Sequence, residues 1–540
     1  MLPCLRLFLL VLALLPCLTY AQATLSKVWV PDLGNGTYKN PVLYADYSDP
    51  DAIRVGDDFY LISSSFNCVP GLPILHSRDL VNWSIIGSVF TEQPPLARYR
   101  EVQHGNGVWA PAIRYHNKEF YIYYPDPDLG IFVTKARNPA GPWSAPVCVK
   151  AAQGWIDPCP LWDEDGRAYL AHGFAGSRAG IKTLLAVSPM SADGLHLTGL
   201  DALVFDGHPG QLTVEGPKFY KRHGYYYLFA PAGGVATGWQ LVLRARNVYG
   251  PYEMRTVLAQ GTTPTNGPHQ GAWVTTNTGE DWFLHFQDQG PYGRVVHLQP
   301  MTWQNDWPVI GLDPDGDGTG QPVLTYRKPR IKGPAQPRAT PPTSDEFSST
   351  TLGQQWQWHA NPQDYWAYPN GPQGYLRLYS VQLPEGYRNL WQVPNLLLQK
   401  LPAEVFTTTT KLSFTPRVEG EQVGLLVMGL DYAHLALSYQ GGKLLLRQST
   451  CQNADKLTPE TSTPAIELPA GQPVYLRVAM QAGAKCQFSY STDGQVFQSI
   501  GPVFQAREGK WIGAKMGLFC TRPTRFNDAG NADVDWFRVE

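Results

Sequence analysis

The sequence has few charged residues for its length and almost no net charge. Asp, Glu, Lys and Arg make up 16% of the 540 residues, and the formal net charge is −2. Nucleic acids and anionic membranes both attract strongly basic surfaces, so we expect neither as a partner. After residue 23, no segment approaches the ~18 continuous apolar residues that a membrane-spanning helix needs.

The first residues do carry an apolar run, and it has the pattern of a secretory signal peptide. Arg6 precedes LFLLVLALLPCLTY, which leads into the small-x-small sequence AQA. We therefore expect a signal peptide over residues 1–23, a mature chain from near Thr24 and a secreted or periplasmic location. A lipoprotein anchored through Cys17 is the weaker alternative, because a proline precedes it where a small residue is wanted.

Cysteine is scarce as well. No Cys-x-x-Cys spacing occurs, which argues against a zinc site. An exported chain permits disulfides, so buried free thiols and one or two bridges both stay open. The cysteines beyond the signal peptide are Cys68, Cys148, Cys159, Cys451, Cys486 and Cys520.

Aromatic residues, glycine and proline are abundant. Aromatics reach 12% of the chain, which also has 52 glycines and 47 prolines. This balance is typical of a turn-rich, all-β protein. Because 540 residues exceed one ordinary domain, we expect more than one.

Five short segments share a polar or glycine turn followed by an aromatic-rich strand. They recur about every 50 to 60 residues, the length of a four-stranded propeller blade. The pattern predicts a five-bladed β-propeller over residues 24–325; a β-sandwich with long loops is the alternative, but it would not predict so regular a repeat. The segments are GDDFYLISSS (56–65), NKEFYIYYP (117–125), DGRAYLAHGF (165–174), HGYYYLFAPA (223–232) and GEDWFLHFQD (279–288).

The five segments align on one aromatic residue each: Tyr60, Tyr121, Tyr169, Tyr227 and Phe283. About 12 residues before each of these, a recurring position carries chemically useful side chains. Equivalent positions in a propeller lie at equivalent distances from its axis, so we expect these side chains to converge. They are Asp49, Trp109, Asp157, Glu215 and, in the last repeat, His269 and Gln270 beside Gly271.

Three carboxylates around one axis favour a catalytic role. Burying a carboxylate without compensation costs several kcal/mol, so stability alone does not explain the cluster. Paired carboxylates act as general acid and general base when glycosidic bonds are cut. Binding of Ca²⁺ is the competing interpretation, but each acid is followed by Pro or Gly-Pro, which indicates rigid display and not a flexible chelating loop.

Several motifs, in order, resemble those of glycoside hydrolase family 43 across roughly residues 38–311. They are YSDPDAIRVGDDFYLISSSF, VWAPAIRYHNKEFYIYY, WIDPCPLWDEDGRAYLAHG, VEGPKFYKRHGYYYLF and YGRVVHLQPM. The resemblance implies an inverting enzyme in which Asp49 is the base, Asp157 tunes and orients the acid, and Glu215 is the acid. It also implies that Arg294 contacts sugar hydroxyls. His269 matches a channel histidine that helps hold a hydrated Ca²⁺ in many members.

The remaining candidate residues would bind the substrate. Trp109 offers a flat apolar face for a sugar ring, although it could also fill the channel wall. Phe66 and Gln270 are the other candidates. His269 could equally be a core histidine. We expect the chemistry itself to require no cofactor, while the resemblance implies a structural Ca²⁺ in the propeller channel.

The rest of the chain reads as a linker followed by a second all-β domain. Residues 326–343 are rich in proline and basic residues, which is typical of an exposed connector. Residues 344–540 show short alternating strands that predict a two-sheet antiparallel sandwich. They also resemble the sandwich domain of the family's xylosidase and arabinofuranosidase branches, which implies a concanavalin-like or jelly-roll type. Whether this domain binds polysaccharide or closes the propeller pocket, for example with Arg522–Asn527, stays open.

Together these features predict a secreted enzyme that releases xylose or arabinofuranose from plant polysaccharides such as xylan or arabinan. The alternatives are a non-catalytic carbohydrate-binding propeller and a retaining fructan hydrolase of related architecture. A fructan hydrolase would carry a WxNDPNG-like motif near the start of the first repeat, where this sequence has DYSDPD.

Overall fold

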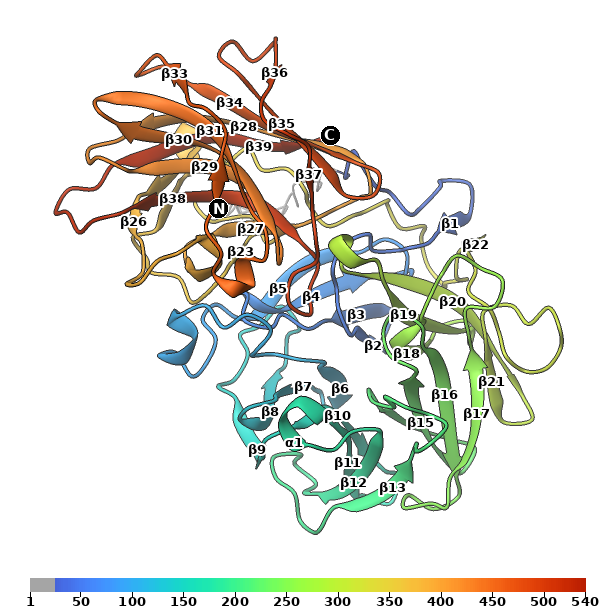
Figure 1. Ribbon diagram of the computed structural model, residues 1–540. Helices are drawn as coiled ribbons and strands as arrows, with labels where there is room; N and C mark the ends of the chain where they lie inside the picture. The colour runs from blue at the N-terminus through green and yellow to red at the C-terminus, as the bar shows by residue number, and fades with distance from the viewer. Residues whose placement is uncertain (1–24) are drawn as a thin grey trace, which may run out of the picture.

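The computed structural model describes residues 25–540, so the expected signal peptide lies outside the described residues. Strands dominate both halves of the chain (Figure 1). The helical elements are short: α1 (Gly176–Ala179) and the 3-10 helices η1 (Arg98–Arg100), η2 (Gly290–Tyr292), η3 (Gly371–Gln373), η4 (Leu390–Gln392) and η5 (Ala454–Lys456). Within residues 25–540, none of them has the length and apolar character of a membrane-crossing helix.

Five four-stranded antiparallel sheets form the propeller, which confirms the predicted blade count. Each blade uses four strands in chain order. The blades are β2 (Asp51–Val55), β3 (Asp58–Ile62), β4 (Gly71–Ser77) and β5 (Ser84–Phe90); β6 (Ala112–His116), β7 (Glu119–Asp126), β8 (Gly130–Ala136) and β9 (Val147–Ala151); β10 (Trp155–Trp162), β11 (Ala168–Phe174), β12 (Leu184–Met190) and β13 (Ala202–Asp206); β14 (Lys218–Arg222), β15 (Tyr225–Ala232), β16 (Trp239–Ala245) and β17 (Glu253–Leu258); β18 (His269–Thr275), β19 (Asp281–Asp288), β20 (Arg294–Gln304) and β21 (Trp307–Ile310).

The ring closes through the segment ahead of the first blade. Leu43 pairs with Val296 of β20 by two backbone hydrogen bonds, and apolar residues of the first and last blades share one core cluster. Two short strands outside the blades, β1 (Thr37–Lys39) and β22 (Thr325–Arg327), also pair. The segment predicted as a linker therefore begins inside a strand. The first strands of neighbouring blades contact one another, which places them at the axis.

The C-terminal domain is the predicted two-sheet sandwich, with its main core cluster formed by residues of both sheets. One sheet contains β23 (Gln357–Trp358), β26 (Val381–Gln382), β27 (Leu397–Lys400), β29 (Gln422–Met428), β30 (Tyr432–Gln440), β31 (Lys443–Cys451), β32 (Thr461–Ser462), β33 (Ile466–Leu468) and β38 (Lys515–Arg522). The other contains β24 (Ala367–Asn370), β25 (Tyr375–Tyr379), β28 (Phe406–Thr415), β34 (Val474–Gln481), β35 (Lys485–Ser491), β36 (Gln498–Ser499), β37 (Phe504–Gln505) and β39 (Asn531–Val539).

The two domains pack against each other, with the sandwich beside the first blade (Figure 1). Backbone hydrogen bonds cross the contact, including a reciprocal pair between Val69 and Trp358. All six cysteines within residues 25–540 are free thiols, and five of them are buried. Of the two possibilities left open by the sequence, the structure therefore has free thiols.

Candidate active site

Asp49 lies just ahead of β2, with both carboxylate oxygens held by hydrogen bonds. Arg294 Nη1 donates to Oδ1 at 2.8 Å, and Ser64 Oγ donates to Oδ2 at 2.6 Å. Asp49 has a φ of 53°, a left-handed conformation that costs a residue other than glycine about 1–2 kcal/mol. The surrounding structure therefore fixes this carboxylate in an unfavourable local conformation, as is common at functional sites.

Asp157 lies inside β10 at an irregularity in the pairing with β11. Its φ is 57°, and its Oδ2 accepts a hydrogen bond from the backbone N–H of Gly216 at 2.7 Å. Burial raises its pKa well above the ordinary value, and the negative charges of Glu215 and Asp49 raise it further. The three predicted acids therefore lie close enough to interact electrostatically.

Glu215 stands ahead of β14 and remains partly accessible, with 25% of its side chain exposed. Its Oε1 lies 2.9 Å from Nε2 of His269, the first residue of β18. Gly216 has a φ of 59°, and a Cβ there would come within 2.5 Å of the Gln270 side chain. Glycine at this position lets the backbone reach Asp157 while Gln270 packs above it.

Arg294, the first residue of β20, connects these acids to a cavity of about 700 Å³. Its guanidinium lines the cavity and bonds Asp49, and the charges of Asp49, Asp288 and Glu215 all act on it. Among the predicted site residues, Arg294 is the one that lines this cavity wall. Asp49 lies behind it, with 8% of its side chain exposed.

The aromatic candidates lie side by side. The ring centroids of Phe66 and Trp109 are 6.4 Å apart, and Trp109 donates its indole N–H to the carbonyl of Gly105 at 2.9 Å. Phe66 is buried with a φ of 52°, whereas Trp109 is partly accessible. Trp109 is therefore the better placed of the two to meet a ligand.

Gln270 is buried beside His269 and has a φ of 32°. Within residues 25–540, no hydrogen-bond partner reaches its Oε1. A buried amide oxygen without a partner is a group that a ligand or water must satisfy.

A loop of the sandwich domain forms one wall of the cavity. Residues 508–512 line it, and the indole of Trp511 lies 6.2 Å from that of Trp109. The alternative that Arg522–Asn527 closes the pocket does not match this geometry, because those residues are absent from the cavity wall and the Arg522 guanidinium donates to the carbonyl of Ser380.

The sequence analysis also missed His104 and Trp391, whose stacked rings are 3.4 Å apart in the cavity wall. One feature of the sequence could have pointed to the 508–512 loop as part of the site. The segment GKWIG places a tryptophan between two glycines, outside any predicted strand. Trp511 is 48% exposed and lines the cavity, so its ring is free to meet a ligand.

His269 is the residue that the resemblance places beside a hydrated Ca²⁺. In residues 25–540, no group of three or more His, Cys, Asp or Glu side chains is placed to hold a metal ion. The Nε2 atom of His269 faces Glu215, and a Ca²⁺ site needs six to eight oxygen ligands. Within residues 25–540, no hydrogen-bond partner reaches Nδ1 of His269. The hydrated Ca²⁺ stays a prediction, and no step is derived through a metal.

A propeller whose axis gathers three carboxylates and an arginine beside a walled cavity has the parts of an O-glycosyl hydrolase. The model of glycosyl hydrolases family 43 matches residues 38–308, and the model of the β-xylosidase C-terminal concanavalin A-like domain matches residues 344–540. The chain belongs to glycoside hydrolase family 43, as its motifs predicted.

Known relatives match most of this chain. A putative β-xylosidase of Xylanibacter ruminicola is 40% identical over 92% of this chain and 88% of its own. A non-reducing end α-L-arabinofuranosidase of Bacteroides ovatus is 30% identical over 94% and 95%. The crystal structure of a family 43 protein from Bacillus licheniformis superposes with a TM-score of 0.79 at 26% identity, covering 93% of this chain and 99% of that one.

Proposed function

We propose that this hydrolase is a secreted, inverting β-xylosidase that removes xylose from the non-reducing ends of xylan fragments. Relatives at 40% and 33% identity are named putative β-xylosidase and β-xylosidase. α-L-Arabinofuranosidase activity is the second candidate, because the relative at 30% identity carries that name. The signal-peptide pattern of residues 1–23 supports secretion.

The observation that carries the proposal is the separate anchoring of two carboxylates at one axis. Asp49 is held by Arg294 and Ser64, and Glu215 is held by His269. In an inverting reaction one carboxylate activates water while the other protonates the leaving oxygen. Separate anchors fix the two carboxylates independently, as their different roles require.

Asp49 is the proposed general base. Its Oδ1 and Oδ2 already accept hydrogen bonds, so the remaining lone pairs are the ones that can take a proton from water. Arg294 fixes the carboxylate and presents further N–H donors at the cavity wall, where they can bind sugar hydroxyls. One arginine thus orients both the base and the substrate.

Glu215 is the proposed general acid, since it is more exposed than Asp49 or Asp157. A quarter of its side chain is exposed, which leaves the carboxyl free to donate a proton to a leaving oxygen beside it. His269 fixes the orientation of this carboxyl, and Asp157 holds the peptide N–H of the following residue. These contacts keep the proton donor in one position during bond cleavage.

The cavity wall favours a short ligand. Trp511 of the sandwich domain lines the cavity, 6.2 Å from the indole of Trp109, and offers an indole face for the apolar face of a sugar ring. A wall contributed by the 508–512 loop limits how far a polysaccharide can extend past the site. Removal of single terminal sugars suits this shape better than cleavage within a long chain.

Turnover of a substrate panel tests the proposal. We expect hydrolysis of 4-nitrophenyl β-D-xylopyranoside and xylobiose with higher kcat/KM than 4-nitrophenyl α-L-arabinofuranoside. Binding of xylose without turnover of any glycoside would point to the non-catalytic alternative. Hydrolysis of fructans in place of pentosides would point to the retaining alternative.

A further inference from the structure

Asp46 is a buried aspartate on the same segment as Asp49, and its carboxylate joins three parts of the molecule. Oδ1 accepts hydrogen bonds from the backbone N–H of Arg294 at 2.9 Å and from Ser48 Oγ at 2.8 Å. Oδ2 accepts from the backbone N–H of Gly513 at 3.0 Å. Only 2% of Asp46 is exposed, so these donors replace its water shell.

Two glycines allow the chains to approach Asp46 this closely. Gly293 has a φ of 77°, and a Cβ there would lie 2.5 Å from the Asp46 side chain. A Cβ on Gly513 would lie 2.6 Å from the backbone nitrogen of Gly293. The last blade and the loop that carries Trp511 therefore meet at this carboxylate, with no room for a side chain on either glycine.

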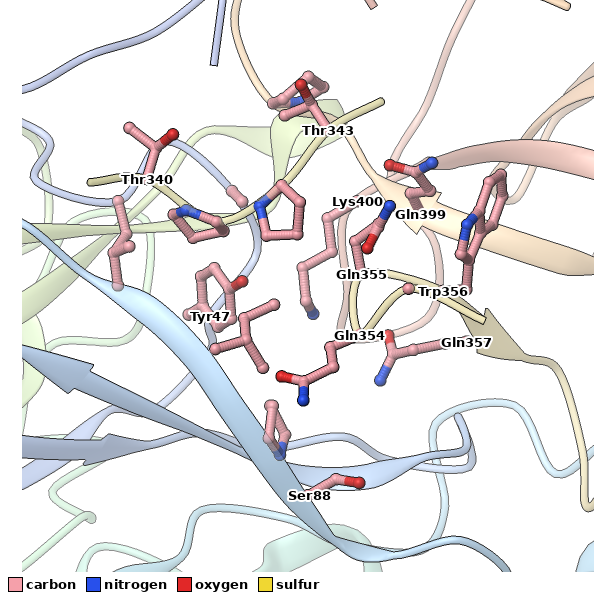
Figure 2. Close-up of a pocket in the computed structure, with 18 of the residues that line it drawn as sticks. Tyr47, Ser88, Thr340, Thr343, Gln354, Gln355, Trp356, Gln357, Gln399 and Lys400 are labelled. Atoms are coloured by element: carbon pink, nitrogen blue, oxygen red, sulfur yellow. The ribbon is translucent and has the colours of Figure 1, made fainter. Parts of the chain in front are cut away.

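The sandwich domain also holds Asp46 from the other side. Lys400, at the end of β27, donates from Nζ to the backbone carbonyl of Asp46 at 2.5 Å. Figure 2 shows the Lys400 side chain entering the space between Tyr47 and Gln354, in an interdomain cavity of about 260 Å³. Burial, with the nearby charge of Lys515, lowers the pKa of Lys400 to about 8. A lysine held here at this electrostatic cost indicates a role beyond packing.

We infer that Asp46 is a positioning residue through which the sandwich domain sets the geometry of the catalytic base. Its carboxylate fixes the backbone of Arg294, whose guanidinium holds Asp49. It also fixes Gly513, which follows the 508–512 loop that carries Trp511. The base, the sugar-binding arginine and the sandwich wall are thereby placed relative to one another by a side chain that does not line the cavity.

Asp46→Asn tests this inference, which rests on the proposed function. The amide keeps the shape and one acceptor oxygen, but turns an N–H donor toward a backbone N–H. We expect kcat to fall about 10- to 100-fold with a smaller change in KM, because a displaced base slows chemistry more than it weakens binding. Asp79→Asn is the control, since Asp79 is a buried aspartate between β4 and β5 that accepts from the N–H groups of Val81 and Asn82 and pairs with Lys328, away from Arg294.

A double-mutant cycle with Ser64→Ala separates positioning from general destabilisation. Ser64 also holds Asp49, so the kcat of the Asp46→Asn/Ser64→Ala double variant should fall by less than the product of the two single losses. For Asp79→Asn with Ser64→Ala, the loss in kcat should equal the product of the single losses. The inference is overturned if Asp46→Asn keeps wild-type kcat, matches Asp79→Asn in its loss, or multiplies with Ser64→Ala. A wild type inactive on every pentoside would refute the proposed function instead, before any variant is compared.

Discussion

Arg294 and Asp49 are joined by a 2.8 Å bond between Nη1 and Oδ1, although they lie in the last and first parts of the propeller sequence. The pair forms where the ring closes, so the proposed base and a cavity-lining arginine depend on the same closure. A closed ring of blades thus brings together groups that no single blade could hold.

Arg294→Lys should lower kcat/KM about 10- to 100-fold, because lysine lacks the rigid fork that bonds Asp49 while facing the cavity. Steady-state kinetics on 4-nitrophenyl β-D-xylopyranoside measure the loss. Arg244→Lys is the control, since Arg244 is equally buried, with 11% of its side chain exposed, but pairs with Glu253 in the fourth blade. Equal losses in the two variants would argue against a catalytic role for Arg294.

Glu215→Gln should lower kcat by about 10²- to 10⁴-fold on xylobiose, whose leaving group needs a proton. On a nitrophenyl xyloside the loss should be smaller, because that leaving group departs without protonation. Comparing kcat for the two substrates gives the result. A loss of the same size on both would mean that Glu215 does not act as the acid.

Asp157→Asn should stabilise the folded protein at neutral pH while lowering kcat. Burial and the charges of Glu215 and Asp49 raise the pKa of Asp157 above its ordinary value of 3.8. The stability of the wild type therefore falls as the pH rises from the pKa of the unfolded state to the raised pKa of the folded state. Asparagine does not ionise and can still accept the hydrogen bond from Gly216. The variant's Tm advantage, about 1–4 °C, should therefore grow with pH.

The control for this pH dependence is Asp163→Asn. Burial opposes ionisation of Asp163, but hydrogen bonds from Lys221 and Tyr226 outweigh it and lower its pKa. Asp163 therefore contributes stability above its unfolded pKa that is lost as pH falls through the lowered one. Thermal scans at several pH values should show opposite signs for the two variants; an Asp157→Asn advantage independent of pH would contradict the raised pKa.

Trp511→Ala should raise KM for xylobiose about 2- to 10-fold and leave Tm nearly unchanged, since its exposed ring contributes binding and little packing. Phe526→Ala is matched in exposure, 49% against 48%, and lies in the other loop considered for pocket closure. We expect wild-type kinetics for Phe526→Ala. The opposite ranking of the two variants would assign the wall to residues 522–527.

The sequence predicted the propeller because each blade repeats the same local pattern, and the positions of Asp49, Asp157 and Glu215 relative to the strands are part of that repeat. It also predicted the sandwich from alternating strands. Contacts between blades carry no such signal. The pairing of His269 with Glu215 depends on two blades meeting at the axis.

The contacts between domains were equally hidden in the sequence. Trp511 and Gly513 reach the propeller site from a distant part of the chain, through a loop that belongs to neither the repeat nor the strand pattern. Asp46 is the first residue of the DYSDPD segment, but nothing in the repeat distinguished it from its neighbours. Its importance lies in the number of donors that reach it, which only the folded chain reveals.

The anomer released first is the most direct test of the central claim, that Asp49 and Glu215 act as base and acid on opposite sides of the bond. Time-resolved proton NMR of 4-nitrophenyl β-D-xylopyranoside hydrolysis, started with concentrated enzyme, separates the anomers before mutarotation. Direct attack by activated water inverts the centre, so α-xylose should appear first. Initial release of β-xylose would contradict this account and require a covalent intermediate.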